Sequence, residues 1–398
     1  MKYCSSKGLI LLFTVLFFPP IFCSQLAQAT SALSSVTSSL GIPAPLTEDK
    51  QVTRFQSFTI EEFPFINREG TRLYGTVFIP NVRTDNGRFP MITIAYGTAC
   101  INRMYGLLFR ELAKRGYIVS AVDYRGQGFS EGVLPVAPNG KIDGDAFGND
   151  IIDFQEYVIK NYPVDQESLG IWGWSLGTVV TPVVLSRPEG RNYKAISQMG
   201  ILRTDLTEKV ANVQYDYEDV SSAPLQIQSC IGALHDEDFI APWWWSPVEA
   251  YEVYKGPKMI ILHGPSYGMA GMTTKERVYD YAYDVADFFD AFLKEDPDAY
   301  ARLLQPDPFC NQIGRTFDFG EDKREFTEDE RAMIEEARRT RGAKVSTNIF
   351  LPMWRGVVAP MLALVNEPLE VGIKSIVPWD RLWVGFMDYW EYNTEPMP

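Results

Sequence analysis

The chain has 398 residues, of which 46% are hydrophobic and 22% are charged, so it can bury a large core and has the composition of an ordinary globular protein. Its net charge of -14 and its isoelectric point near 4.8 disfavour nucleic acid and anionic membrane surfaces as partners, because both attract clusters of Lys and Arg. Only two histidines are present and no Cys/His cluster has zinc-ligand spacing, which disfavours a metal site built on imidazole.

The first 29 residues have the pattern of a secretory signal peptide. Two lysines precede an apolar run over residues 9–22, and a small-x-small sequence ends at Ala29, where we expect cleavage. The run is interrupted by two prolines and is too short for a stable membrane span. We therefore expect a secreted or periplasmic protein. A lipid anchor on Cys23 is the alternative, which the bulky Phe22 before it disfavours.

Three cysteines remain after such a cleavage: Cys100, Cys230 and Cys310. This is an odd number for a chain sent to an oxidising compartment. One disulfide with a free thiol and three buried thiols are both consistent with the count.

Residues 30–50 are rich in Ser, Ala, Pro and Gly and are predicted to form a flexible linker. Residues 51–298 open with two strand-like runs, at 55–60 and 73–78, and then alternate short apolar strands with helices. This alternation predicts a doubly wound, mostly parallel α/β sheet with helices on both faces. The later predicted strands are 91–96, 117–122, 169–174, 195–199, 225–231 and 259–262, and the predicted helices are 105–115, 147–160, 176–185, 247–254 and 277–293.

Residues 299–398 do not continue the alternation. A charged helix is predicted over 327–340, with Thr327 as its N-cap, and an apolar stretch and an aromatic-rich tail follow. Either this segment is a C-terminal extension that packs on the core, or it forms a lid over a substrate.

Ser175 is the candidate nucleophile. In Gly173-Trp174-Ser175-Leu176-Gly177 it ends an apolar strand and opens a helix rich in Val and Leu. A serine in such a turn is held in a tight backbone conformation, and the glycines two residues away on either side leave room for it. The N–H of Leu176 lies at the positive end of the helix dipole and would point at the oxygen that becomes negative when Ser175 attacks a carbonyl.

Two segments resemble known hydrolase motifs. Residues 171–177, I-W-G-W-S-L-G, resemble the nucleophile turn of prolyl-oligopeptidase-like serine hydrolases, including dipeptidyl peptidases. Residues 122–132, V-D-Y-R-G-Q-G-F-S-E-G, look like the loop after the fourth strand in α/β-hydrolases, particularly the cocaine-esterase and acyl-peptidase branches. The resemblance covers about residues 70–295 and implies the α/β-hydrolase fold with the chain order serine, acid, histidine. We expect the second loop to be structural, with Arg125 tying it to a carboxylate.

A second oxyanion donor is expected where the third core strand ends, in Tyr96-Gly97-Thr98. The resemblance to dipeptidyl peptidases and cocaine esterase implies that the hydroxyl of Tyr96 is this donor. The backbone N–H of Thr98 is a second choice. In the third arrangement, Tyr96 is a core tyrosine whose hydroxyl forms a hydrogen bond with the backbone.

Activating a serine at neutral pH takes a base, and His235 and His263 are the only imidazoles. His263 is preferred because it follows the predicted last core strand, although the family's usual place for the histidine is occupied by Tyr267-Gly268. Asp238 is the preferred acid and Asp236 the alternative, and either would orient the imidazole.

Trp243, in a run of three tryptophans after the acid loop, and Trp174, beside the nucleophile, are candidate substrate-binding residues; packing in the core or against a partner is the alternative. The sequence as a whole predicts a serine hydrolase that cleaves a small-molecule ester, or a short peptide, through an acyl-enzyme on Ser175 without a cofactor. Its rivals are a prolyl-oligopeptidase-like peptidase and a non-catalytic α/β-hydrolase-like binding protein that lacks a competent histidine.

Overall fold

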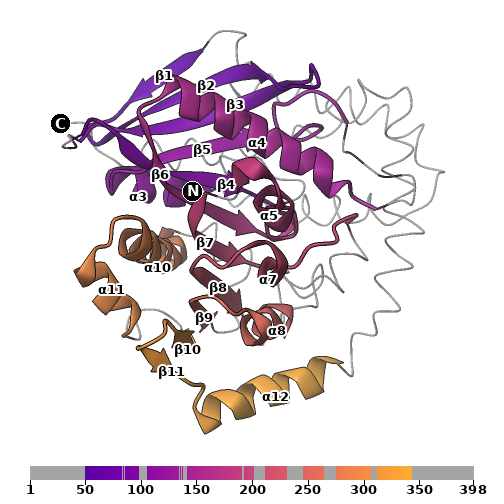
Figure 1. The fold of residues 1–398 in the computed structure, drawn as a ribbon, viewed down its shortest axis with the longest axis vertical. Helices are drawn as coiled ribbons and strands as arrows, with labels where there is room; N and C mark the ends of the chain where they lie inside the picture. Colours follow the sequence, from indigo (N-terminus) through magenta and orange to yellow (C-terminus); the bar gives the residue numbers. More distant parts are fainter. Residues whose placement is uncertain are drawn as a thin grey trace, which may run out of the picture.

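The computed structural model describes residues 50–342, apart from residues 83, 85, 134, 136 and 191 and segments 98–104, 138–140, 201–210, 231–244, 264–274 and 306–311. Within these residues a twisted sheet forms the centre of the molecule (Figure 1). Its strands are β1 (Gln51–Arg54), β2 (Phe58–Ile66), β3 (Arg72–Pro80), β4 (Phe89–Ala95), β5 (Ile118–Asp123), β6 (Val164–Trp174), β7 (Tyr193–Met199), β8 (Leu225–Cys230), β9 (Lys258–His263), β10 (Gln312–Asp318) and β11 (Lys323–Arg324).

The strand order places a topological switch point at β4. The sheet runs β1-β2-β3-β5-β4-β6-β7-β8-β9-β10-β11, so the chain leaves β4 for β5 on one side and later returns to β6 on the other. The strands from β5 to β9 are parallel, and those at both ends of the sheet pair antiparallel. In open α/β sheets ligands bind at the carboxyl ends of the strands beside such a switch point. The candidate site is therefore expected where β4 and β6 end.

Helices cover both faces of the sheet. On one face α3 packs on α10 and α10 on α11, whereas on the other α4 packs on α5 and α5 on α7 (Figure 1). The helices are α3 (Gly106–Lys114), α4 (Gly144–Asn161), α5 (Leu176–Ser186), α7 (Tyr217–Val220), α8 (Trp245–Val253), α10 (Lys275–Leu293), α11 (Pro297–Leu303) and α12 (Glu328–Gly342), with a 3-10 turn, η3 (Pro188–Gly190). The predicted fold class is confirmed: this is the α/β-hydrolase arrangement.

The predicted elements of the core agree with the structure to within a few residues, because strands buried on both faces leave continuous apolar runs. All six residues of β5, for example, are buried. The opening is different: of the predicted strand at 55–60 only residues 58–60 belong to a strand, since β1 ends at Arg54 and β2 begins at Phe58.

Part of the predicted C-terminal extension joins the core. Residues 299–342 contribute most of α11 together with β10, β11 and α12, and β10 extends the sheet by pairing antiparallel with β9. The N-cap predicted at Thr327 is confirmed as a capping box: its hydroxyl accepts from the Glu330 N–H, and its own N–H donates to the Glu330 carboxylate. The predicted signal peptide and linker, apart from residue 50, and residues 343–398 lie outside the described residues.

Candidate active site

Ser175 lies at a sharp turn between β6 and α5. Its backbone has φ 52° and ψ -117°, a conformation that residues other than glycine rarely adopt. The Ser175 N–H donates to the carbonyl of Met199 on β7, and the Ser175 carbonyl accepts from both the N–H and the hydroxyl of Thr178. Ser175 is half-buried, whereas Trp174 and Leu176 beside it are buried. This is the geometry of a nucleophile turn, with the serine reachable and its backbone fixed.

The first turn of α5 packs directly against the end of β4. A Cβ atom on Gly177 would lie 1.7 Å from the carbonyl oxygen of Ala95, so only glycine fits without moving the backbone. The N–H groups of a first helical turn have no acceptor within the helix. The N–H of Leu176 and the segment after β4, which are the two predicted sources of oxyanion donors, therefore meet at the switch point.

Tyr96 directs its hydroxyl toward β5. The Tyr124 N–H donates to this hydroxyl at 2.7 Å, and the two rings stack with their centroids 4.3 Å apart. Tyr124 follows β5, which pairs with β4 on the side opposite β6 and Ser175. Of the three expected arrangements, this one corresponds to a fully buried core tyrosine whose hydroxyl is bonded to the backbone. Thr98 lies outside the described residues.

His263 is the last residue of β9 and is fully buried. The strand continues through it, since it pairs with Cys230 on β8 and with Gln312 on β10. Its Nε2 lies 2.7 Å from Oε1 of Gln228. Burial, and secondarily the positive charge of Arg315, lower the pKa of His263 to about 3.

This environment differs from the one that a general base needs. Gln228 shares a face of β8 with Gln226, whose amide donates to the carbonyl of Asp284 on α10, so the imidazole lies in the layer between the sheet and α10. β9 is three strands from β6, or roughly 14 Å at the usual strand spacing. A base needs hydrogen-bond contact with its serine and a pKa near the working pH. The predicted role of His263 rested on a strand that ended before it, and β9 does not.

Several predicted site residues lie outside the described part of the chain. His235, Asp236, Asp238 and Trp243 belong to segment 231–244, and Tyr267 belongs to segment 264–274. Their roles stay predictions.

Trp174 is directed into the protein, with 6% of its surface exposed. Its ring packs on that of Tyr105, with centroids 5.5 Å apart, and on the backbone of Gly97. Tyr105, the residue before α3, was not singled out from the sequence, because nothing local distinguishes it from an ordinary core aromatic. The structure brings it to the candidate site.

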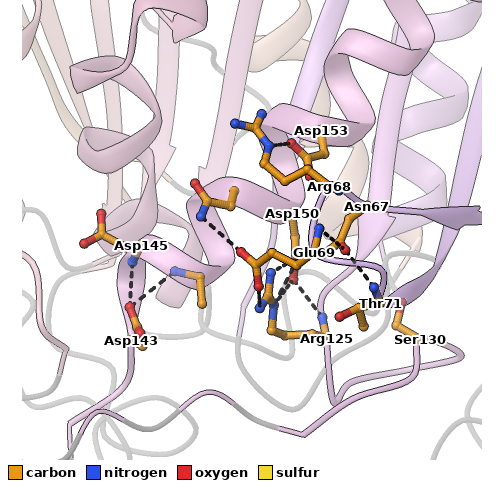
Figure 2. Close-up of polar contacts among 12 residues, drawn as sticks. Asn67, Arg68, Glu69, Thr71, Arg125, Ser130, Asp143, Asp145, Asp150 and Asp153 are labelled. Atoms are coloured by element: carbon orange, nitrogen blue, oxygen red, sulfur yellow. Dashed lines mark hydrogen bonds and ion pairs between the residues drawn. The ribbon is translucent and has the colours of Figure 1, made fainter.

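The loop after β5 is tied down by Arg125, as predicted (Figure 2). The guanidinium forms a bidentate pair with Asp150 of α4, with Nη2–Oδ1 at 2.7 Å and Nε–Oδ2 at 3.0 Å, and reaches Glu69 at 2.6 Å. The buried Asp150 also accepts from Asn67 and from the Arg125 N–H. Burial raises the pKa of Asp150 although Arg125 stabilises its charge. This clamp of Arg125, Asp150 and Glu69 holds the loop, and with it Tyr124, the residue before Arg125, in place beside the switch point.

Two kinds of feature are absent from the described ranges. No helix there is long and apolar enough to cross a membrane. No group of three His, Cys, Asp or Glu side chains there is placed to hold a metal ion.

Comparison with known proteins points to one family. Residues 108–266, which include Ser175 and His263, match the prolyl oligopeptidase family. The probable dipeptidyl-aminopeptidase B of Podospora anserina is 27% identical over 139 residues, which are 31% of this chain and 15% of that protein. Dipeptidyl peptidase 4 of Bos taurus is 25% identical over 145 residues, which are 35% of this chain and 19% of that protein. The chain thus spans less than a fifth of these relatives.

Among solved structures, an acetyl xylan esterase from Paenibacillus sp. R4 superposes with a TM-score of 0.45 at 17% identity, over 69% of this chain and 95% of that one.

The strand order, the nucleophile turn and the family match lead to one conclusion. The chain is an α/β-hydrolase whose central part is similar to the serine hydrolases of the prolyl oligopeptidase family.

Proposed function

We propose that the chain hydrolyses carboxylic esters through an acyl-enzyme on Ser175. The hydroxyl oxygen attacks the carbonyl carbon and gives up its proton to a base, and the Leu176 N–H stabilises the oxyanion. The alcohol then leaves with that proton, and water hydrolyses the acyl-serine. No diffusible cofactor is required by these steps.

The backbone of Ser175 carries this proposal. A residue held at φ 52° and ψ -117° costs the fold about 1–3 kcal/mol, and such strain persists mainly where it serves a site. Here it places a half-buried serine at the carboxyl end of the interior strand β6 and at the N-terminus of α5. An ordinary turn between β6 and α5 would not need it.

The base is proposed to be a histidine held by Asp238 or Asp236, with His263 and His235 as the two choices. The ring of His263, bonded to Gln228 inside the core with a lowered pKa, weighs against His263. His235 would then serve from the acid's own loop.

Two other functions follow from specific observations. The names of the matched relatives favour the removal of dipeptides from a peptide, which uses the same acyl-enzyme chemistry. The buried imidazole of His263 favours a non-catalytic binding protein with the same fold.

Labelling with an alkyl fluorophosphonate tests the proposal. The wild type should gain one adduct that peptide mapping places on Ser175, and Ser175→Ala should lose both the adduct and p-nitrophenyl ester hydrolysis, by about 10³-fold or more. Ser186→Ala, at the other end of α5, is the matched control and should keep both.

The substrate panel separates the three functions. Turnover of p-nitrophenyl esters without turnover of dipeptide p-nitroanilides supports the esterase, and the reverse supports the peptidase. An unlabelled wild type that turns over neither would leave the binding protein. Among the variants, His235→Ala and His263→Ala identify the base, since only the true base should abolish turnover.

Export remains part of the proposal. The leader pattern predicts that the mature chain begins after Ala29, and N-terminal sequencing of protein recovered from the culture medium or periplasm tests this. Recovery only as an uncut intracellular chain would refute it.

A further inference from the structure

Two tyrosines flank the end of β4 and pack toward different neighbouring strands. The hydroxyl of Tyr96 lies on the β5 side, where it is bonded to the Tyr124 N–H. The ring of Tyr105 lies on the β6 side, the side of Ser175, since it packs on both tryptophans of β6. Of the two tyrosines, Tyr105 is thus the one beside the strand that leads to the nucleophile.

Tyr105 is held firmly in this place. The residue exposes 3% of its surface, and its ring contacts those of Trp172, Trp174 and Phe109, with centroids 5.2, 5.5 and 6.2 Å away. From there its hydroxyl accepts the N–H of Gly97 at 3.4 Å. That bond is long, so the packing of the ring, more than the bond, fixes where the hydroxyl sits.

Gly97 in turn lies directly against the nucleophile turn. A Cβ atom on Gly97 would be 3.3 Å from the Cβ of Ser175 and 2.6 Å from the ring of Trp174. The backbone of Gly97 therefore packs against one side of the Ser175 side chain. A shift of this backbone would change the space in which the serine hydroxyl can rotate.

We propose that Tyr105 is a positioning residue for Ser175, acting through Gly97. Its hydroxyl anchors the Gly97 N–H, and the anchored backbone holds the serine side chain in the direction of attack. The inference rests on the proposed function, because it concerns the rate of attack by Ser175. It also predicts that kcat depends on the hydroxyl of Tyr105 more than on the hydroxyl of Tyr96.

Tyr105→Phe in the full chain tests the proposal, since it removes the hydroxyl and keeps the ring. We expect kcat for p-nitrophenyl ester hydrolysis to fall about tenfold with KM within about twofold, because small misplacement of a reacting group lowers the rate and not the binding. Hydrogen exchange at the Gly97 amide should become faster, because the amide loses its acceptor.

Tyr254→Phe is the matched control. Tyr254 is equally buried, and its hydroxyl donates to the carbonyl of Ala223. Ala223 precedes β8 and so lies at the amino ends of the parallel strands, away from the carboxyl ends where Ser175 lies. Because the bond of Tyr254, at 2.5 Å, is shorter than the bond of Tyr105, Tyr254→Phe should lose at least as much thermal stability as Tyr105→Phe and keep the wild-type kcat. A merely structural role for Tyr105 would leave kcat at the wild-type value in both variants.

Each other outcome overturns the inference. Wild-type kcat in Tyr105→Phe would show that the anchor does not govern attack, even if Gly97 exchanged faster. A change in KM alone would make Tyr105 a substrate contact, and a larger kcat loss in Tyr96→Phe would assign the dependence to the β5 side. Failure of the proposed function is distinguishable, because the wild type would then be inert to esters and unlabelled at Ser175; that result refutes both.

Discussion

The free energy of unfolding should fall at acidic pH because of His263. The ring is fully buried, bonded to Gln228 and close to Arg315, which is itself paired with Asp284 at 2.6 Å. Protonation would place a second positive charge in this layer. The folded protein therefore keeps His263 neutral, with its pKa lowered to about 3, whereas the unfolded chain protonates it near the ordinary value of about 6.5.

The direction and size of the effect follow from this difference. Because the folded pKa is lowered, the contribution of His263 to stability is complete above about pH 6.5 and is lost as the pH falls toward 3. Between about pH 7.5 and pH 5 the unfolded side chain takes up nearly one proton and the folded one takes up almost none. The free energy of unfolding should therefore fall by about 2 kcal/mol from this residue alone.

Urea unfolding of the wild type and of His263→Gln at about pH 7.5 and about pH 5 measures how much His263 contributes to the pH dependence of stability. The glutamine keeps a donor for Gln228 and cannot titrate, so the variant should lose about 2 kcal/mol less than the wild type between the two pH values. Every other titrating group is common to both proteins and cancels in the comparison. Equal pH dependence would refute the buried, neutral histidine, and would return His263 to consideration as an exposed base.

Three further variants test the packing around the site. Gly177→Ala places a methyl group against the carbonyl of Ala95, and should cost about 1–3 kcal/mol by thermal unfolding and abolish fluorophosphonate labelling; labelling at the wild-type rate would contradict the close approach. Arg125→Ala leaves the buried Asp150 unpaired and should cost about 3–5 kcal/mol in urea unfolding, with Arg125→Lys in between; a loss equal to that of an exposed surface arginine would contradict the clamp. Thr327→Ala removes the cap of α12 and should cost about 1 kcal/mol where Thr327→Ser costs little; equal losses in both variants would exclude the hydroxyl as the cause.

The core elements and the nucleophile turn could be predicted because their causes are local. A central parallel strand is buried on both faces and leaves a short apolar run, and an amphipathic helix leaves its stripe, whatever lies elsewhere in the chain. The turn at Ser175 depends on the end of β6, the start of α5 and the glycines between them. The tie of Arg125 to a carboxylate could be predicted in kind, but its partner Asp150, on α4, could not.

The environments of His263, Tyr96 and Tyr105 were decided only by the tertiary structure. β9 continues through His263 because it is paired on both sides there, with β8 and with β10. β10 lies about 50 residues later in the chain, so the sequence around His263 does not reveal this pairing. The hydroxyl of Tyr96 is bonded beside β5 and the ring of Tyr105 packs on β6 because β4 lies between these two strands. Strand order is set by the crossovers rather than by any residue near the tyrosines. A sequence pattern thus determines which backbone segments form the site, whereas the partner and the protonation of each side chain depend on neighbours that only folding brings together.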